Sequence, residues 1–156
     1  MDAPLGGARI LIVESDYYGD IAATLLGGAK RRLDAAKVSY DVVTVPGALE
    51  IPQAAVIALQ AARGAQTYDG VVALGCVIRG ETSHYDIVAG ESARALMEIG
   101  VTRGVPVGNG ILTVDNEKQA HVRAALDGGD KGGVAAAAAL ALVRLKRDRA
   151  RPRKRR

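Results

Sequence analysis

The sequence contains no tryptophan and no phenylalanine, and its aromatic share of 3% consists of five tyrosines. The core must therefore be built from Ala, Val, Leu and Ile, and the position of each tyrosine needs an explanation. A single cysteine, Cys76, excludes an intrachain disulfide. The two histidines, His84 and His121, are not spaced with Cys76 as metal ligands, so no metal site is expected.

Long apolar runs are also missing. No stretch approaches the roughly 18 apolar residues of a membrane helix, and the first residues lack the basic segment that opens a signal peptide. We therefore expect a cytoplasmic protein with no membrane partner. The phosphate-binding and dinucleotide-binding glycine motifs are absent as well, which argues against those nucleotide-binding classes.

Positive charge is concentrated at the C-terminal end. The net charge is +4, but nine Lys/Arg and one Asp between Arg144 and Arg156 give this end +8 and leave residues 1–143 with −4. The negative net charge of residues 1–143 thus argues against a nucleic-acid-binding domain. We interpret residues 147–156 as a disordered, solvated basic tail. The alternative is that the tail binds nucleic acid or an anionic surface electrostatically.

Hydrophobic periodicity predicts one domain at residues 9–146, after a short extension at 1–8. The pattern favours strands at 9–14, 38–45, 71–74 and 106–113, the last with a bulge at Gly108 or Gly110. Helices are predicted at 21–36, 48–63, 86–99, 117–126 and 134–146, and a loop at 75–84. This alternation is typical of an α/β fold with a parallel sheet covered on both faces and a ligand site at the carboxyl ends of the strands.

Three segments after predicted strands carry the residues suited to chemistry: 45–52, 73–88 and 110–123. In the second segment, Gly80 precedes three polar residues at the start of a helix, where backbone N–H groups and hydroxyls bind anions. His84 lies in the same turn and suits proton transfer at neutral pH. Arg123 and Lys131 could add positive charge. The residues therefore predict acid–base chemistry on a small phosphorylated substrate.

The three segments read P-G-A-x-E-I-P, A-L-G-x-V-I-R-G-x-T-x-H-x-D, and G-I-L-T followed by Q-A and an arginine. Together they resemble the signatures of the lumazine synthases, and the similarity covers about residues 9–146. The resemblance implies a flavodoxin-like three-layer fold with a four-stranded parallel sheet flanked by helices. It also implies a transferase of riboflavin biosynthesis that joins 5-amino-6-(D-ribitylamino)uracil to 3,4-dihydroxy-2-butanone 4-phosphate and releases phosphate and water.

The resemblance further implies partners and assembly. No metal or redox cofactor is used, the only ligands are the two small-molecule substrates, and the product passes to riboflavin synthase. The chain would form a homo-oligomer, either a pentamer or an assembly of pentamers, with the sites between subunits.

Residue roles carry over by position. His84 matches the proton-transfer group. Residues matching the phosphate site are Glu81 (through its backbone), Thr82, Arg123 and Lys131. Residues matching the pyrimidine and ribityl pocket are Tyr17, Ala48, Leu49, Glu50, Cys76, Val77, Ile78 and Asn109. Of these, Asn109, Arg123 and Lys131 would face a substrate held mainly by the adjacent chain.

Some positions depart from the family pattern. Asp16-Tyr17-Tyr18 stands where Arg-Phe-Asn is usual, Cys76 where Thr is common, Asn109 where many members have an aromatic residue, and Lys118 where Glu is usual. These departures leave open a rival function, that of a weakly active paralogue that binds flavin or forms a shell. A generic flavodoxin-like nucleotide binder is disfavoured, because the sequence offers no aromatic pair to sandwich a flavin.

Overall fold

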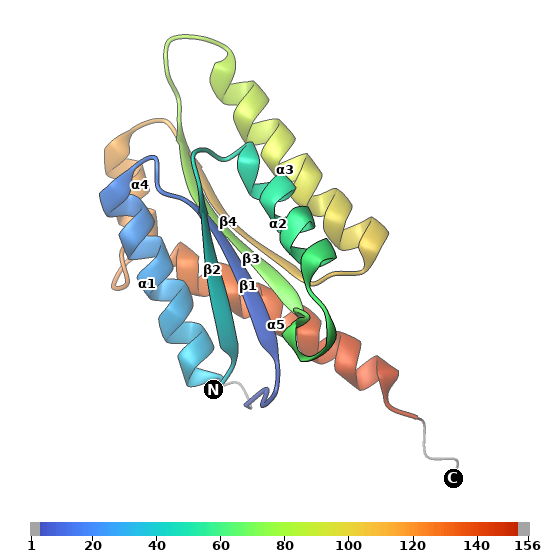
Figure 1. Cartoon of the computed structure of the whole chain (residues 1–156). Helices are drawn as coiled ribbons and strands as arrows, with labels where there is room; N and C mark the ends of the chain where they lie inside the picture. The colour runs from blue at the N-terminus through green and yellow to red at the C-terminus, as the bar shows by residue number, and fades with distance from the viewer. Residues whose placement is uncertain (1–3, 153–156) are drawn as a thin grey trace.

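A computed structural model describes residues 4–152 and contains a single four-stranded sheet (Figure 1). The elements in chain order are β1 (Arg9–Ser15), α1 (Gly19–Ala35), β2 (Ser39–Val45), α2 (Glu50–Ala61), a 3₁₀ turn (Gly64–Gln66), β3 (Gly70–Ile78), α3 (His84–Arg103), β4 (Val107–Val114), α4 (Glu117–Ala124) and α5 (Lys131–Ala150). All neighbouring strands are parallel, in the order β2-β1-β3-β4. The predicted fold class and element order are confirmed.

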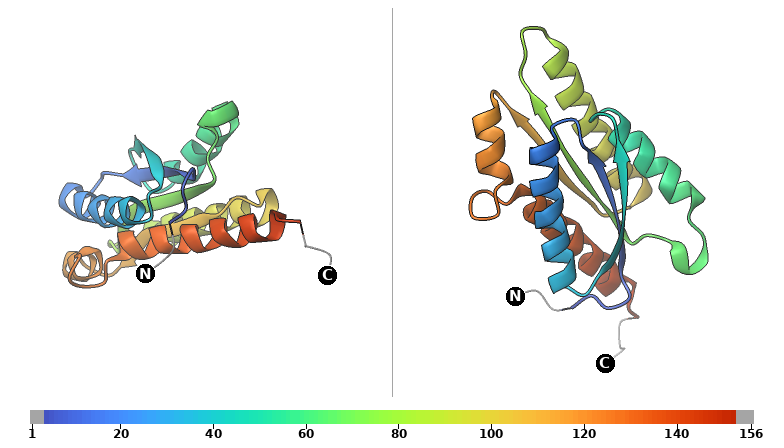
Figure 2. Two further views of the ribbon diagram at one scale, coloured as in Figure 1. Left: turned by 90° about the horizontal axis from the view of Figure 1, so that it is seen from below. Right: turned by 60° about the vertical axis from the view of Figure 1, so that its left-hand side comes forward.

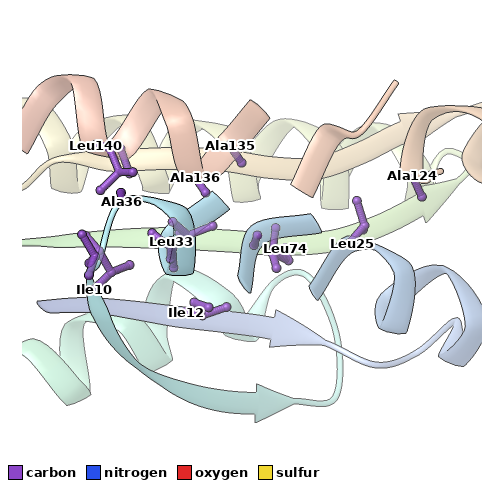
Figure 3. Close-up of a cluster of buried hydrophobic side chains, with 14 of the residues drawn as sticks. Ile10, Ile12, Leu25, Leu33, Ala36, Leu74, Ala124, Ala135, Ala136 and Leu140 are labelled. Carbon is purple, nitrogen blue, oxygen red and sulfur yellow. The ribbon is translucent and has the colours of Figure 1, made fainter. Parts of the chain in front are cut away.

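Helices cover both faces of the sheet, and side-chain alternation along β1 explains why. Ile10 and Ile12 point to the face covered by α1, α4 and α5, whereas Leu11 and Val13 point to the face covered by α2 and α3. Figure 3 shows the first cluster, in which Leu33 of α1 and Leu140 of α5 lie over the sheet. Burial on both sides is the pattern expected of a parallel sheet.

The predicted bulge in β4 is wrong, because β4 pairs with β3 in unbroken register from Val71↔Val107 to Ile78↔Val114. The glycines of β4 serve helix packing instead. A Cβ atom at Gly108 would overlap the backbone carbonyl of Ala135 in α5. The missing side chain therefore lets α5 lie directly against the strand.

The end of β3 and both ends of α3 also differ from the prediction. The strand continues through Gly75 and Cys76 to Ile78, so the first four residues of the predicted loop 75–84 belong to the sheet. Helix α3 begins at His84, two residues before the predicted start, and runs on to Arg103, where Gly104 ends it in the left-handed conformation at φ 62°.

The start of the basic tail is helical rather than irregular, since α5 extends to Ala150. Arg147 is tied down by an ion pair with Asp69 at 3.9 Å and a hydrogen bond to the carbonyl of Gly6 at 3.3 Å. The last turn of α5 projects from the body of the molecule (Figure 2). Residues 153–156 of the predicted tail lie outside the described residues. Within 4–152, none of the helices has the length and apolarity needed to cross a bilayer.

Candidate active site

A hollow of about 470 Å³ opens at the carboxyl ends of β1, β2 and β3, between the segment before α1 and the first turns of α2 and α3. This is the position expected of a ligand site in an open parallel sheet. Nine of the thirteen predicted site residues line it: Tyr17, Ala48, Leu49, Glu50, Cys76, Val77, Ile78, Thr82 and His84. Segments far apart in the sequence are thus brought together around one cavity.

One wall of the hollow comes from the turn after β2. The hydroxyl of Ser15 donates to the carbonyl of Pro46 at 3.3 Å and ties the ends of β1 and β2 together. A Cβ atom at Gly47 would lie only 2.9 Å from Oε2 of Glu50. Because glycine has no side chain, the Glu50 carboxylate can lie close to this turn. Glu50 is exposed at the start of α2 and is available to a ligand in the hollow.

The opposite wall is the loop from β3 to α3. Its Thr82 hydroxyl accepts a 3.3 Å hydrogen bond from the backbone N–H of His84. Thr82, Ser83 and His84 are all exposed. The first turn of α3 therefore presents backbone N–H groups, a hydroxyl and an imidazole to the same side, a combination that suits an anionic group and a proton transfer.

Three of the five tyrosines line the hollow: Tyr17, Tyr18 and Tyr85. Tyr17 is 73% exposed, and its ring meets that of Tyr18 edge to face, with centroids 4.9 Å apart. Burial raises the pKa of Tyr18 above its ordinary value, and the neighbouring Tyr17, Cys76 and Glu117 raise it further. A mostly exposed ring at the mouth of a cavity is a surface on which a flat heterocycle can stack.

Cys76 lies on β3 with its side chain half-buried. Burial raises the pKa of its thiol to about 11, with a smaller contribution from Glu117. The group is therefore a neutral thiol at physiological pH and acts as part of the wall rather than as a nucleophile.

The remaining four predicted residues do not line the hollow. Glu81 is exposed on the loop before α3, and Arg123 lies on α4, where its Nη1 donates to the carbonyl of Gln119 at 3.2 Å. Lys131 is exposed at the first position of α5, directly after Asp130, whose carboxylate accepts from the N–H of Gly133 at 3.3 Å. Asn109 lies on β4 and lines a second, apolar groove.

The hollow also contains residues that the sequence reasoning did not single out as site residues: Ser15, Tyr18, Gly47, Gly80, Tyr85 and Val88. Two of them are tyrosines, and the scarcity of aromatic residues in the sequence could have marked these two as candidate site residues. Among the described residues, no cluster of three or more His, Cys, Asp or Glu could hold a metal ion.

Comparison with known proteins bears on this arrangement. Residues 7–147 match the family model described as 6,7-dimethyl-8-ribityllumazine synthase. The chain belongs to the 6,7-dimethyl-8-ribityllumazine synthase family. The resemblance inferred from the three motifs is thereby confirmed.

Individual relatives of this family match nearly the whole chain. The 6,7-dimethyl-8-ribityllumazine synthase of Methylobacterium radiotolerans is 61% identical over 154 residues, which is 97% of this chain and 92% of the relative. The synthase of Azorhizobium caulinodans is 60% identical over 145 residues, 92% of this chain and 90% of the relative. The 6,7-dimethyl-8-ribityllumazine synthase 1 of Rhizobium meliloti is 58% identical over 145 residues, 92% of this chain and 95% of the relative.

Proposed function

We propose that this member of the lumazine synthase family condenses 5-amino-6-(D-ribitylamino)uracil with 3,4-dihydroxy-2-butanone 4-phosphate. The products are 6,7-dimethyl-8-ribityllumazine, inorganic phosphate and water. The observation that carries the proposal is the family match over residues 7–147, in which residues of the first two motifs converge on one hollow. The reaction requires a primary amine to attack a ketone, loss of water from the carbinolamine, and elimination of phosphate.

His84 is the proposed proton-transfer group. It lies at the first position of α3, exposed and at the edge of the hollow, where its imidazole can exchange protons with a bound substrate. Both substrates are reactive in themselves, so much of the acceleration would come from holding them together. Loss of His84 would then slow the reaction by roughly 10²-fold, the low end for acid–base catalysis.

The phosphate is proposed to bind at the N-terminal end of α3. Thr82 provides a hydroxyl and Glu81 its backbone, and the helix dipole favours a negative charge at this position. The two cations predicted for the phosphate, Arg123 and Lys131, lie on α4 and α5, and neither lines the hollow of its own chain. A neighbouring copy would supply them.

The pyrimidine is proposed to stack on Tyr17 against a wall of Cys76, Val77 and Ile78. The ribityl chain would lie along Ala48, Leu49 and Glu50 at the start of α2. The Glu50 carboxylate can accept hydrogen bonds from hydroxyl groups of that chain. Tyr17 and Glu50 are exposed, so a second surface would be needed to exclude water from the reaction.

An oligomer with sites between subunits is supported by uncovered apolar surface. A groove of about 500 Å³ runs between α3 and α5 beside β4, lined by Met97, Val101, Leu142 and Leu145, which are 68%, 74%, 43% and 52% exposed. Monomeric proteins rarely expose such contiguous apolar patches. Asn109 lines the same groove, so an adjacent copy seated there would bring it close to a substrate.

We propose that the oligomer is a pentamer or an assembly of pentamers. Light scattering on purified protein should then give a mass of 81 kDa for five chains of 16.2 kDa, or a multiple of it. A monomer would contradict the proposal. We place the enzyme in the cytoplasm, where its product would pass to riboflavin synthase.

The direct test of the activity is lumazine formation from the two substrates, followed by absorbance. His84→Ala should lower kcat by roughly 10²-fold, and His121→Ala, which alters an exposed histidine of α4, is the matched control. Intact oligomers of the native protein with no turnover would contradict the proposed activity and favour the flavin-binding or shell-forming alternative.

A further inference from the structure

Arg79 is the first residue after β3 and contacts two other segments, the first turn of α3 and the end of β4 with the turn that follows it. Its backbone N–H donates to the carbonyl of Val114 at 2.9 Å. Its guanidinium lies 4.2 Å from the ring centroid of Tyr85, and its Nη1 lies 3.7 Å from Oδ1 of Asp86. Its Nε lies 3.3 Å from Oδ1 of Asp115. One side chain thus joins the end of β3, the first turn of α3 and the turn after β4.

The loop between these contacts has little packing of its own. Residues 80–84 are all exposed, and a Cβ atom at Gly80 would meet no atom within 4 Å. The hydrogen bonds that order it are short-range ones, from the N–H of His84 to Thr82 and from the N–H of Asp86 to Ser83. The contacts of Arg79 therefore fix both ends of a loop that the core does not hold.

The same guanidinium is linked through Asp115 to the helix that carries Arg123. The backbone N–H of Asp115 donates to Oε1 of Gln119 at 2.9 Å, and the carbonyl of Gln119 accepts from Arg123 at 3.2 Å. Arg79 therefore links the loop before α3 to the start of α4 through Asp115.

The contacts of Arg79 are suited to fixing the position of the loop rather than to stabilising the fold. Its side chain is 48% exposed, and those of Asp86 and Asp115 are 66% and 67% exposed, so each ion pair alone contributes little to folding. The planar guanidinium lies over a ring, donates a hydrogen bond to Asp115 and forms an ion pair with Asp86, a combination that a lysine cannot reproduce. Three weak contacts to two separate segments, the first turn of α3 and the turn after β4, define where those segments lie relative to one another.

We infer that Arg79 is a positioning residue, which holds the loop 80–83 and His84 in the conformation that receives the phosphate group of the substrate. The inference rests on the proposed function of this loop. Arg79 does not line the hollow, so it acts through Thr82 and His84 rather than on the substrate.

The kinetic test compares Arg79→Gln with the native protein. The KM for the sugar phosphate should rise roughly tenfold, because the loop samples other positions, while the KM for the pyrimidine and the melting temperature stay near native values. Arg79→Lys should restore only part of the loss. The matched control is Arg94→Gln, which removes two ion pairs of α3, to Glu91 and Glu98, away from the loop.

Two readouts do not depend on turnover. Hydrogen exchange at the backbone amides of residues 80–84 should be faster in Arg79→Gln than in the native protein and unchanged in Arg94→Gln. Inorganic phosphate, measured by calorimetry, should bind more weakly to Arg79→Gln. Equal exchange and equal phosphate binding in the native protein and Arg79→Gln would overturn the inference. A native protein that binds phosphate but shows no turnover would overturn only the proposed activity.

Discussion

The hydroxyl of Tyr68 donates a 2.6 Å hydrogen bond to the carboxylate of Asp41, at the amino end of the sheet. Asp41 also pairs with Arg9, whose guanidinium lies 4.9 Å from the ring centroid of Tyr68. The hydrogen bond from Tyr68, followed by the bond and charge of Arg9, outweighs burial and holds the pKa of Asp41 below its ordinary value. The three side chains join the beginnings of β1, β2 and β3.

This arrangement predicts a pH-dependent effect of Tyr68→Phe. A lowered pKa in the folded state stabilises the protein above the unfolded pKa of about 3.9, and the stabilisation is lost as the pH falls through the folded value. Tyr68→Phe should therefore cost about 0.5 kcal/mol at pH 7, a small value because Asp41 is 44% exposed. The difference should vanish in strong acid. Urea unfolding at several pH values measures it, with Tyr85→Phe as control, and a pH-independent difference would argue against the Asp41 linkage.

Adjacent glycines of α1 should respond oppositely to alanine. A Cβ atom at Gly27 would meet nothing within 4 Å, whereas one at Gly28 would overlap the Asp130 carboxylate that caps α5 and lie 3.1 Å from the N–H of Gly133. Gly27→Ala should stabilise the protein by about 0.5–1 kcal/mol. Gly28→Ala should destabilise it by about 1–2 kcal/mol through the displaced cap. Chemical unfolding of both variants measures the difference, and effects of equal sign would contradict this packing.

Sites shared between copies can be tested by mixing two impaired variants. If His84 and Arg123 of one site come from different chains, refolding His84→Ala together with Arg123→Ala should produce about one quarter of native sites with both groups intact. The turnover of the mixture should then clearly exceed that of either variant alone. The control is a mixture of His84→Ala with the double variant, which contains no intact site. A mixture no more active than its parts would mean that each site is built within one chain.

Cys76 should react slowly with alkylating reagents. Because burial raises the pKa of its thiol to about 11, iodoacetamide at pH 8 should modify it roughly tenfold or more slowly than a free cysteine. The rate should keep rising with pH beyond pH 9. Mass spectrometry of timed samples measures the rate, and unfolded protein provides the reference. Fast labelling of the native protein at neutral pH would contradict a buried, neutral thiol.

The order of strands and helices could be predicted from the sequence because buried β-branched runs and helical spacing are local patterns. The end of β3 could not, since Gly75 and Cys76 interrupt the β-rich pattern. In the structure, a Cβ atom at Gly75 would lie 3.2 Å from Ile51 of α2, so this glycine allows the helix to pack closely on the strand. Because α2 is distant along the chain, its packing against the strand leaves no pattern in the sequence around Gly75.

Site residues that belong to the sequence motifs could be predicted, whereas those that reach the hollow only through packing could not. The motifs placed His84, Thr82 and Glu50, which the fold brings to one hollow, but only the structure shows that Tyr18 and Tyr85 line the same hollow. Apolar residues of α3 are only a partial guide to its buried face, because Met97 and Ile87 are 68% and 54% exposed. Periodicity shows that a face is apolar, but it does not tell whether the same chain covers it.

The positions of the tyrosines allow ligand binding to be followed by the protein's own fluorescence. With no tryptophan in the sequence, the intrinsic ultraviolet emission comes from five tyrosines alone, and three of them line the hollow. A heterocycle that enters and stacks on Tyr17 would quench most of this emission without any added dye. Occupancy could therefore be followed by fluorescence titration of the unmodified protein, even in variants that no longer turn over substrate.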